Sequence, residues 1–217
     1  MKKETQKIIV LVIMFVFPIV IYLFFASGKN NFAKLPVLTP SVLNLKSFTH
    51  IEGQEVKLDG HITILCYWGS DLNFKKGDAF NLNQKIYKRF YQFKDFQLVA
   101  LITDDQEDQL KFLKEELSNG VGTDLVNWKF MKGSPLSIKN HFTSLKTSLS
   151  LDSKHSTPYV FIIDRKSNLR GRDDDEDIGI LFGYNAQSVA ELNNKMEDDV
   201  KVILAEYRLA LKKYSVR

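Results

Sequence analysis

The chain begins with a long apolar segment, and this segment constrains its architecture more than any other feature. Residues 8–25 form an uncharged run of about 18 residues, close to the roughly 20 residues with which a helix crosses the hydrocarbon core of a bilayer. Pro18 lies inside the run, and membrane-spanning helices tolerate proline better than soluble helices do. We therefore expect one transmembrane anchor over residues 8–27, after a short tail of residues 1–7, with the membrane as a partner through residues 8–25.

Two other interpretations of this segment are open. A secretory signal peptide has an apolar core of about 7–15 residues before a small-residue cleavage site, and Ala26-Ser27-Gly28 could serve as that site. The run is longer than such a core, which favours a permanent signal anchor. A soluble buried helix is disfavoured because no polar positions give the run an outer face. No cysteine comes directly after the run, so a lipid-anchored lipoprotein is excluded.

The lysines that flank the run predict its orientation. Lys2, Lys3 and Lys7 precede it, whereas Lys29 and Lys34 follow it, and the excess before the helix favours an N-terminus inside the cell. The domain of this single-pass chain then lies outside the cytoplasm, at the periplasmic face of a bacterial inner membrane. One cysteine allows no internal disulfide, so the core must supply the stability. The net charge of +4 is spread along the chain and indicates no nucleic-acid-binding surface.

The remainder of the chain divides into a tether and a domain. Residues 28–45 are expected to be the tether, because they are polar and contain Pro36 and Pro40. The domain, residues 46–217, opens with a turn at residues 51–54, an alternating segment at residues 55–58 typical of a half-exposed strand, and a turn at Asp59-Gly60. Residues 62–68 are almost continuously apolar, as in a strand that is buried on both faces.

Helix and strand patterns alternate through the rest of the domain. Strands are predicted at residues 96–103, 126–131 and 159–163, with residues 178–182 as the hairpin partner of the last one. Helices are predicted between and after these strands, because apolar residues there recur at helical spacing. These residues are Leu82, Ile86, Phe90 and Phe93; Leu110, Leu113 and Leu117, before an end at Gly120; and Ile138, Phe142, Leu145 and Leu149; the last helix covers residues 191–214. This order predicts an α/β fold with a thioredoxin-like mixed sheet flanked by helices. A flavodoxin-like fold would continue the strand–helix alternation to the end.

Two stretches of the domain resemble one thioredoxin-like family. IEGQEVKLDGHITILCYWGSDLNFKK, from residue 51, is similar to the opening of the Sco/SenC proteins, in which a hairpin and a central strand lead to two aromatic residues and a C-x-x-x-C motif. Tyr67 and Trp68 fill the aromatic positions, while Asp71 and Lys75 stand at the two cysteine positions. The resemblance therefore implies a degenerate member, without the two thiolates that hold copper or form a disulfide in that family.

The second stretch, KHSTPYVFIIDRKSNLRG from residue 154, resembles the family segment in which a metal-ligand histidine precedes a strand. His155 matches that histidine to within one residue. Thr157-Pro158 resembles the cis-proline dipeptide that many thioredoxin-like proteins place beside the active site. Since the family contains the copper chaperones of respiratory oxidases, the resemblance implies a link to oxidase assembly.

Few residues offer chemistry for a site. Cys66 is the lone thiol, and its place in an apolar strand predicts burial as a small hydrophobic side chain; the alternative is a reactive thiol. Asp71 and His155 could meet at one edge of the sheet and bind Zn²⁺ or Cu²⁺, although two ligands make a weak site and Lys75 would repel the ion. A surface ion pair between Asp71 and Lys75, spaced i,i+4, is the simpler interpretation.

Three polar segments have both structural and functional interpretations. The acidic run at residues 173–177 is expected to be a solvated turn, with cation binding as the alternative, although the EF-hand pattern is absent. Thr103-Asp104-Asp105 is expected to cap the next helix, with catalytic carboxylates as the alternative. The terminal helix would be about 36 Å long, and its basic end, residues 208–213, is expected to be solvated, or to dock on a partner or an anionic membrane surface.

The absence of paired cysteines and of the common catalytic motifs argues against an enzyme. We predict a membrane-anchored, redox-inactive binding or assembly module, without a cofactor, that presents the face around Trp68, Asp71 and Thr157-Pro158 to a protein partner. The alternatives are a copper- or zinc-handling protein that uses Asp71 and His155, a single-cysteine thiol oxidoreductase that uses Cys66, and a tethered spacer whose terminal helix does the binding.

Overall fold

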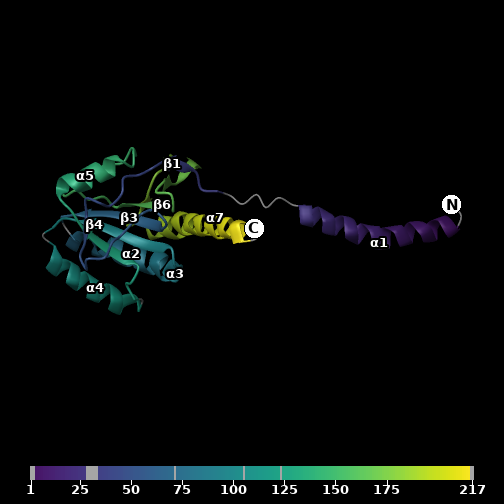
Figure 1. The fold of residues 1–217 in the computed structure, drawn as a ribbon, viewed down its shortest axis with the longest axis horizontal. Coiled ribbons are helices and arrows are strands. Elements are labelled where there is room, and N and C mark those ends of the chain that lie inside the picture. The colour runs from purple at the N-terminus through teal and green to yellow at the C-terminus, as the bar shows by residue number, and fades with distance from the viewer. Residues whose placement is uncertain (1–2, 28–33, 71, 105, 123, 216–217) are drawn as a thin grey trace. The chain divides into compact units, whose positions relative to one another are not determined.

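A computed structural model describes residues 3–27, 34–70, 72–104, 106–122 and 124–215 (Figure 1). The chain divides into two compact units, Met1–Ala33 and Lys34–Arg217. The first unit holds helix α1 (Lys3–Ser27), which contains Pro18. Within it, Thr5–Phe24 is long and apolar enough to cross a membrane, and none of it is buried against protein. The predicted N-terminal apolar helix is therefore present, as a candidate membrane span or signal sequence.

The second unit is built on a mixed sheet. Its strands are β1 (Val37–Thr39), β2 (Thr49–His50), β3 (Ile62–Gly69), β4 (Phe96–Ile102), β5 (Trp128–Lys132), β6 (Tyr159–Ile163), β7 (Leu169–Arg170) and β10 (Tyr184–Asn185). The sheet order is β1-β7-β6-β3-β4-β5-β2, and β10 also pairs with β6. Strands β3, β4 and β5 are parallel, whereas β6 is antiparallel to β3. β8 (Arg172–Asp175) and β9 (Gly179–Leu181) form a separate two-stranded sheet.

Helices cover both faces of this sheet (Figure 1). One face packs against two groups of helical segments. The first group is α2 (Lys76–Leu82), a π-helical turn (Asn83–Tyr87), α3 (Lys88–Phe90) and α4 (Glu107–Val121). The second is the C-terminal run of α6 (Val189–Glu191), a second π-helical turn (Leu192–Met196) and α7 (Glu197–Ser215). The other face packs against α5 (Pro135–Thr143) and the segment before β3. Side chains of β3 alternate between the two cores, as its period of two requires. The predicted thioredoxin-like architecture is confirmed.

The boundary between tether and domain is a correction to the sequence analysis. Residues 28–33 lie outside the described part of the chain, but residues 34–45 belong to the folded unit rather than to a tether. β1 pairs with β7, and Leu35, Val42 and Leu45 are buried. The two prolines exclude a helix here, yet an edge strand tolerates proline at its ends because the N–H group is not needed for pairing.

The predicted hairpin of residues 159–163 with residues 178–182 is wrong. β6 turns instead into β7, and β9 pairs with β8. The Asp164 carboxylate forms this turn by accepting hydrogen bonds from the backbone N–H groups of Lys166 and Asn168, both at 2.9 Å. A short polar turn closed by its own side chain outcompetes a partner fifteen residues further along, because a shorter loop loses less entropy on closure.

Three smaller boundaries differ as well. Residues 55–58 keep the predicted alternation of exposed and buried side chains but pair with no strand in the described part of the chain. Helix α4 passes through Gly120 and ends at Gly122, whose φ of 67° gives the left-handed C-cap. Helix α5 ends at Thr143, although Leu145 beyond it is still buried in the core.

Candidate functional site

The candidate site lies at the C-terminal end of β3, where the two segments singled out in the sequence meet. Gly69 has a φ of 58°, and a Cβ at this position would lie only 1.9 Å from the carbonyl oxygen of Lys154. The Ser70 N–H donates to that carbonyl at 2.9 Å, and the Thr157 N–H donates to the Tyr67 carbonyl at 3.0 Å. Glycine is therefore required at position 69, because its lack of a Cβ lets the two backbones touch.

A buried ion pair fills the space beneath this contact. Lys75 ends a 3₁₀ turn (Leu72–Lys75), and its Nζ donates to Asp78 Oδ2 and to the Thr157 carbonyl, each at 3.2 Å. Lys75 is 6% exposed and Asp78 3% exposed. Burial raises the pKa of the Asp78 carboxyl, and the charge of Lys75 opposes that rise. The expected surface ion pair between Asp71 and Lys75 is thus wrong for Lys75, which is buried and paired elsewhere; Asp71 lies outside the described residues.

Gln106 connects the backbone at Gly69 to the 3₁₀ turn and to the residue after β4. Its Oε1 accepts from the Leu72 N–H at 2.8 Å, and its Nε2 donates to the Gly69 carbonyl at 3.4 Å and to Thr103 Oγ1 at 3.2 Å. Gln106 occupies the N-cap position of α4, which has no side-chain capping bond, so the predicted cap at residues 103–105 is wrong. The sequence analysis missed Gln106, although an amide four residues after a buried strand was the available signal.

His155 lies in the loop that contacts Gly69. It is half-buried, has a φ of 58°, and donates its backbone N–H to the Asp152 carbonyl at 3.1 Å. The Asp152 carboxylate holds the loop by accepting from the Ser156 N–H and Oγ, both at 2.8 Å. The described residues contain no cluster of three or more histidine, cysteine, aspartate or glutamate side chains that could hold a metal. Of the two predicted metal ligands, the structure places His155 alone, because Asp71 lies outside the described residues.

Pro158 stands beside this loop, as the resemblance implied, but its peptide bond with Thr157 is trans, so the cis-proline expectation is wrong. The Thr157 carbonyl accepts from Lys75, while the Pro158 carbonyl accepts from the Ala186 N–H at 2.9 Å. The dipeptide thus connects the buried lysine to the segment after β10.

Cys66 and Trp68 both belong to the interior. Cys66 is fully buried, as predicted, and burial raises the pKa of its thiol well above the ordinary value, with the Asp78 carboxylate adding to the rise. Trp68 is 1% exposed and packs against Trp128 and Phe130, with ring centroids 5.7 and 6.1 Å away. The prediction that Trp68 is presented to a partner is therefore wrong, because alternation along β3 directs it into the core.

Phe74 is the exposed aromatic residue at this edge, and the sequence analysis missed it. Its side chain lies in the 3₁₀ turn and is 77% exposed. The Lys154 ammonium lies 4.7 Å from the centre of its ring. Phe112 on α4 is 52% exposed and has the Lys76 ammonium 4.1 Å from its ring centre. An aromatic residue within a polar stretch, as in Asn73-Phe74-Lys75-Lys76, was the signal for such a surface.

The acidic run is partly a structural ion-pair network. Asp173, Asp174 and Glu176 are exposed, as a solvated turn predicts, whereas Asp175 is buried and its carboxylate lies 2.8 Å from Lys195 Nζ. Burial would raise the pKa of the Asp175 carboxyl, but the hydrogen bond from Lys195 holds it below its ordinary value. The run therefore fastens the β8–β9 hairpin to the π-helical turn before α7.

No protein-family model matches this chain, and no curated protein matches it. Among solved structures, it is similar to BsSco, a member of the Sco family of cytochrome c oxidase assembly proteins, at 13% identity and a TM-score of 0.51, covering 78% of this chain and 98% of that one. It is also similar to an SCO1/SenC family lipoprotein from Bacillus anthracis str. Ames, at 14% identity and a TM-score of 0.50, covering 81% and 99%. The likeness to Sco/SenC proteins expected from the sequence is therefore confirmed at the level of the thioredoxin-like fold.

Proposed function

We propose that this chain is a membrane-anchored, redox-inactive member of the Sco/SenC group that binds a partner protein through the edge around Phe74, His155 and Pro158. The observation that carries the proposal is the buried ion pair of Lys75 with Asp78. It stands where the resemblance places the second cysteine of the C-x-x-x-C motif, so a structural contact occupies the position of a reactive group.

Redox inactivity follows from the state of the remaining thiol. Thiol–disulfide exchange requires attack by an accessible thiolate. Cys66 is fully buried, and its pKa is raised, so the thiol stays protonated and out of reach. Exposing it would separate the strands on both sides of β3. We therefore assign Cys66 to packing and not to a single-cysteine oxidoreductase.

The binding role rests on the exposed part of the same edge. Phe74 offers a large apolar side chain to solvent, and the cations of Lys76 and Lys154 lie nearby on aromatic rings. Aromatic side chains flanked by cations are common anchors of protein interfaces. The turn beneath Phe74 is held by Lys75 and Gln106, so the anchor is positioned before the partner arrives.

The setting of this binding is an analogy from the fold. BsSco belongs to a family of cytochrome c oxidase assembly proteins, and we infer that the partner of this chain also acts in the assembly of a respiratory oxidase. Helix α1 would anchor the chain, with the thioredoxin-like unit on the periplasmic side. The competing function, copper or zinc handling, would use Asp71 and His155.

The test compares variants in cells from which the gene has been deleted. We expect deletion to lower the amount of assembled oxidase, read from its haem absorbance, and a Cys66→Ser copy to restore it. A Phe74→Ser copy should not restore it, while Leu136→Ser, which alters another strongly exposed apolar residue on α5, should. Failure of Cys66→Ser at normal protein levels would contradict the redox-inactive function.

The competing function has its own measurement. Full-length protein in detergent is titrated with Cu²⁺ and Zn²⁺, beside a His155→Ala variant. Micromolar binding that disappears in His155→Ala, together with full activity of Phe74→Ser in cells, would replace the proposed function with metal handling.

A further inference from the structure

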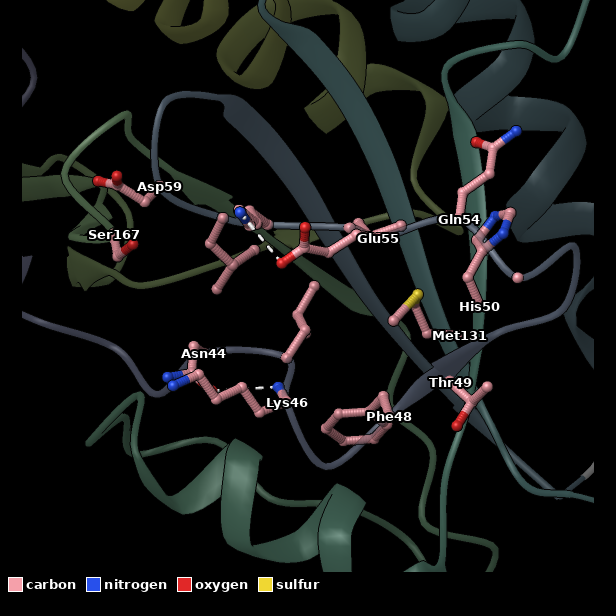
Figure 2. A pocket seen from close by; sticks show the side chains of 15 residues that line it. Asn44, Lys46, Phe48, Thr49, His50, Gln54, Glu55, Asp59, Met131 and Ser167 are labelled. Atoms are coloured by element: carbon pink, nitrogen blue, oxygen red, sulfur yellow. Dashed lines mark hydrogen bonds and ion pairs between the residues drawn. The ribbon is translucent and has the colours of Figure 1, made fainter.

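Residues 53–59, which we call the strap, run beside the sheet and border two cavities. The larger, about 460 Å³, lies between the strap and residues 44–50, with Phe48, Leu58 and Met131 among its lining (Figure 2). The smaller, about 230 Å³, shares residues 54–57 with it. Its other lining residues precede or open β3, β4 and β5, so it lies at the opposite end of these strands from the candidate site.

The smaller cavity is lined by an excess of positive charge. Lys57, Lys94 and Lys129 contribute three ammonium groups, and Glu55 contributes the one carboxylate. Glu55 lies 3.0 Å from Lys57 Nζ, but both side chains are more than half exposed, so this pair is weak in water. Two positive charges are therefore left without a carboxylate partner.

The other two lysines confirm that count. Lys129 Nζ donates to the side-chain oxygen of Gln54 at 3.0 Å, a neutral acceptor, and its only carboxylate neighbour of note, Glu52, is already paired with Lys114. Lys94 makes no ion pair within the part of the chain that the structure describes. His61 also lines the cavity, with its Nδ1 lying 3.2 Å from the Asp59 carbonyl.

Two side-chain amides, of which Gln97 is buried and Asn127 partly buried, fix the frame of the cavity. Gln97, which is 4% exposed, donates through Nε2 to the Lys57 carbonyl at 2.7 Å and to Thr63 Oγ1 at 2.9 Å. Asn127 Nδ2 donates to the Tyr91 carbonyl at 2.8 Å. The Gln97 bond holds the strap against β4, and the Asn127 bond holds the start of β5 against the end of α3, so the backbone segments that carry the three lysines are fixed in place.

We propose that this cavity binds a phosphate group, either free phosphate or the phosphate of a lipid headgroup. A compact dianion would pair with the two ammonium groups that form no ion pair within the described residues, and lysine binds phosphate as a point charge from several directions. The cavity is larger than one phosphate and admits the group to which the phosphate is attached. This site is independent of the proposed partner-binding edge.

The test uses the full chain in nanodiscs of neutral phosphatidylcholine. Inorganic phosphate is titrated at low ionic strength, with amide chemical shifts and calorimetry as readouts. We expect saturable binding, with shifts at Lys57, His61 and Gln97. The double variant Lys94→Gln/Lys129→Gln should weaken binding at least tenfold, and 0.5 M NaCl should weaken it further by screening. Lys139→Gln, an exposed lysine on α5 outside the cavity, is the matched control and should bind as the wild type does.

A second arm distinguishes the two sources of phosphate. The same titration is repeated in nanodiscs that contain phosphatidic acid. If the wild type binds inorganic phosphate in the neutral discs but not in the discs with phosphatidic acid, the lipid headgroup occupies the site. If binding of inorganic phosphate is the same in both, the site is assigned to free phosphate. The proposal is overturned if the wild type binds neither phosphate nor phosphatidic acid, or if the double variant binds as tightly as Lys139→Gln.

Discussion

Replacing Lys75 by methionine should destabilise the domain far more than a surface substitution does. The change keeps the length of the side chain but removes its charge, and it leaves the Asp78 carboxylate with 4% of its side chain exposed and without its cation. Removing one partner of a buried ion pair costs about 3–5 kcal/mol of unfolding free energy. The carbonyl of Thr157 also loses its hydrogen bond from Lys75.

The matching double variant separates the charge from the packing. In Lys75→Met/Asp78→Leu both charges are gone, so the free energy of unfolding should return to within about 1 kcal/mol of the wild type or exceed it. The single variant should also recover as pH falls. Burial already raises the pKa of Asp78 above 3.8, and loss of Lys75 raises it further, so protonation at low pH favours the folded state.

Urea unfolding of the unit Lys34–Arg217 measures these differences. With a slope of about 2 kcal/mol per molar urea, 3–5 kcal/mol lowers the midpoint by about 1.5–2.5 M. The reasoning is refuted if Lys75→Met loses less than about 1 kcal/mol, or if the double variant is as unstable as the single one. Either result would mean that the ion pair is not an essential part of the turn that carries Phe74.

Three further predictions concern other buried groups. Burial lowers the pKa of His141 from 6.5 to about 4, so as pH falls the unfolded chain takes up a proton at this residue before the folded chain does. The free energy of unfolding should therefore fall by up to about 3 kcal/mol between pH 6.5 and 4. His141→Gln should flatten this slope in urea titrations, and an unchanged slope would contradict the assignment. Gly69→Ala should lower the free energy of unfolding by more than about 2 kcal/mol, because the new Cβ would meet the Lys154 carbonyl. Gly53→Ala, at a φ of 74° with open space around it, should lower it by about 1 kcal/mol. Equal thermal midpoints for the two variants would argue against the contact. Cys66 should react with a maleimide only as fast as the domain unfolds, and rapid labelling of the native protein, measured by mass spectrometry against a urea-unfolded sample, would restore a role for the thiol.

The elements that could be predicted from the sequence are those for which an unbroken apolar run is sufficient evidence. The apolar runs at residues 62–68, 96–103 and 159–163 became β3, β4 and β6 almost to the residue. A strand covered on both faces is apolar at nearly every position, and few other structures allow such a run. The burial of Cys66 was readable for the same reason, whereas the N-terminal apolar helix was readable from the length of its uncharged run.

The tertiary structure alone decided which groups meet. Nothing in the local sequence distinguishes Asp78 from Asp71 as the partner of Lys75, since both spacings suit a helix; the Thr157 carbonyl, which approaches from a distant segment, selects the buried position. Likewise, the 3₁₀ turn after β3 directs Phe74 outward while β3 directs Trp68 inward. Periodicity depends only on neighbours along the chain, whereas the site depends on a contact across more than eighty residues that forms when the sheet closes.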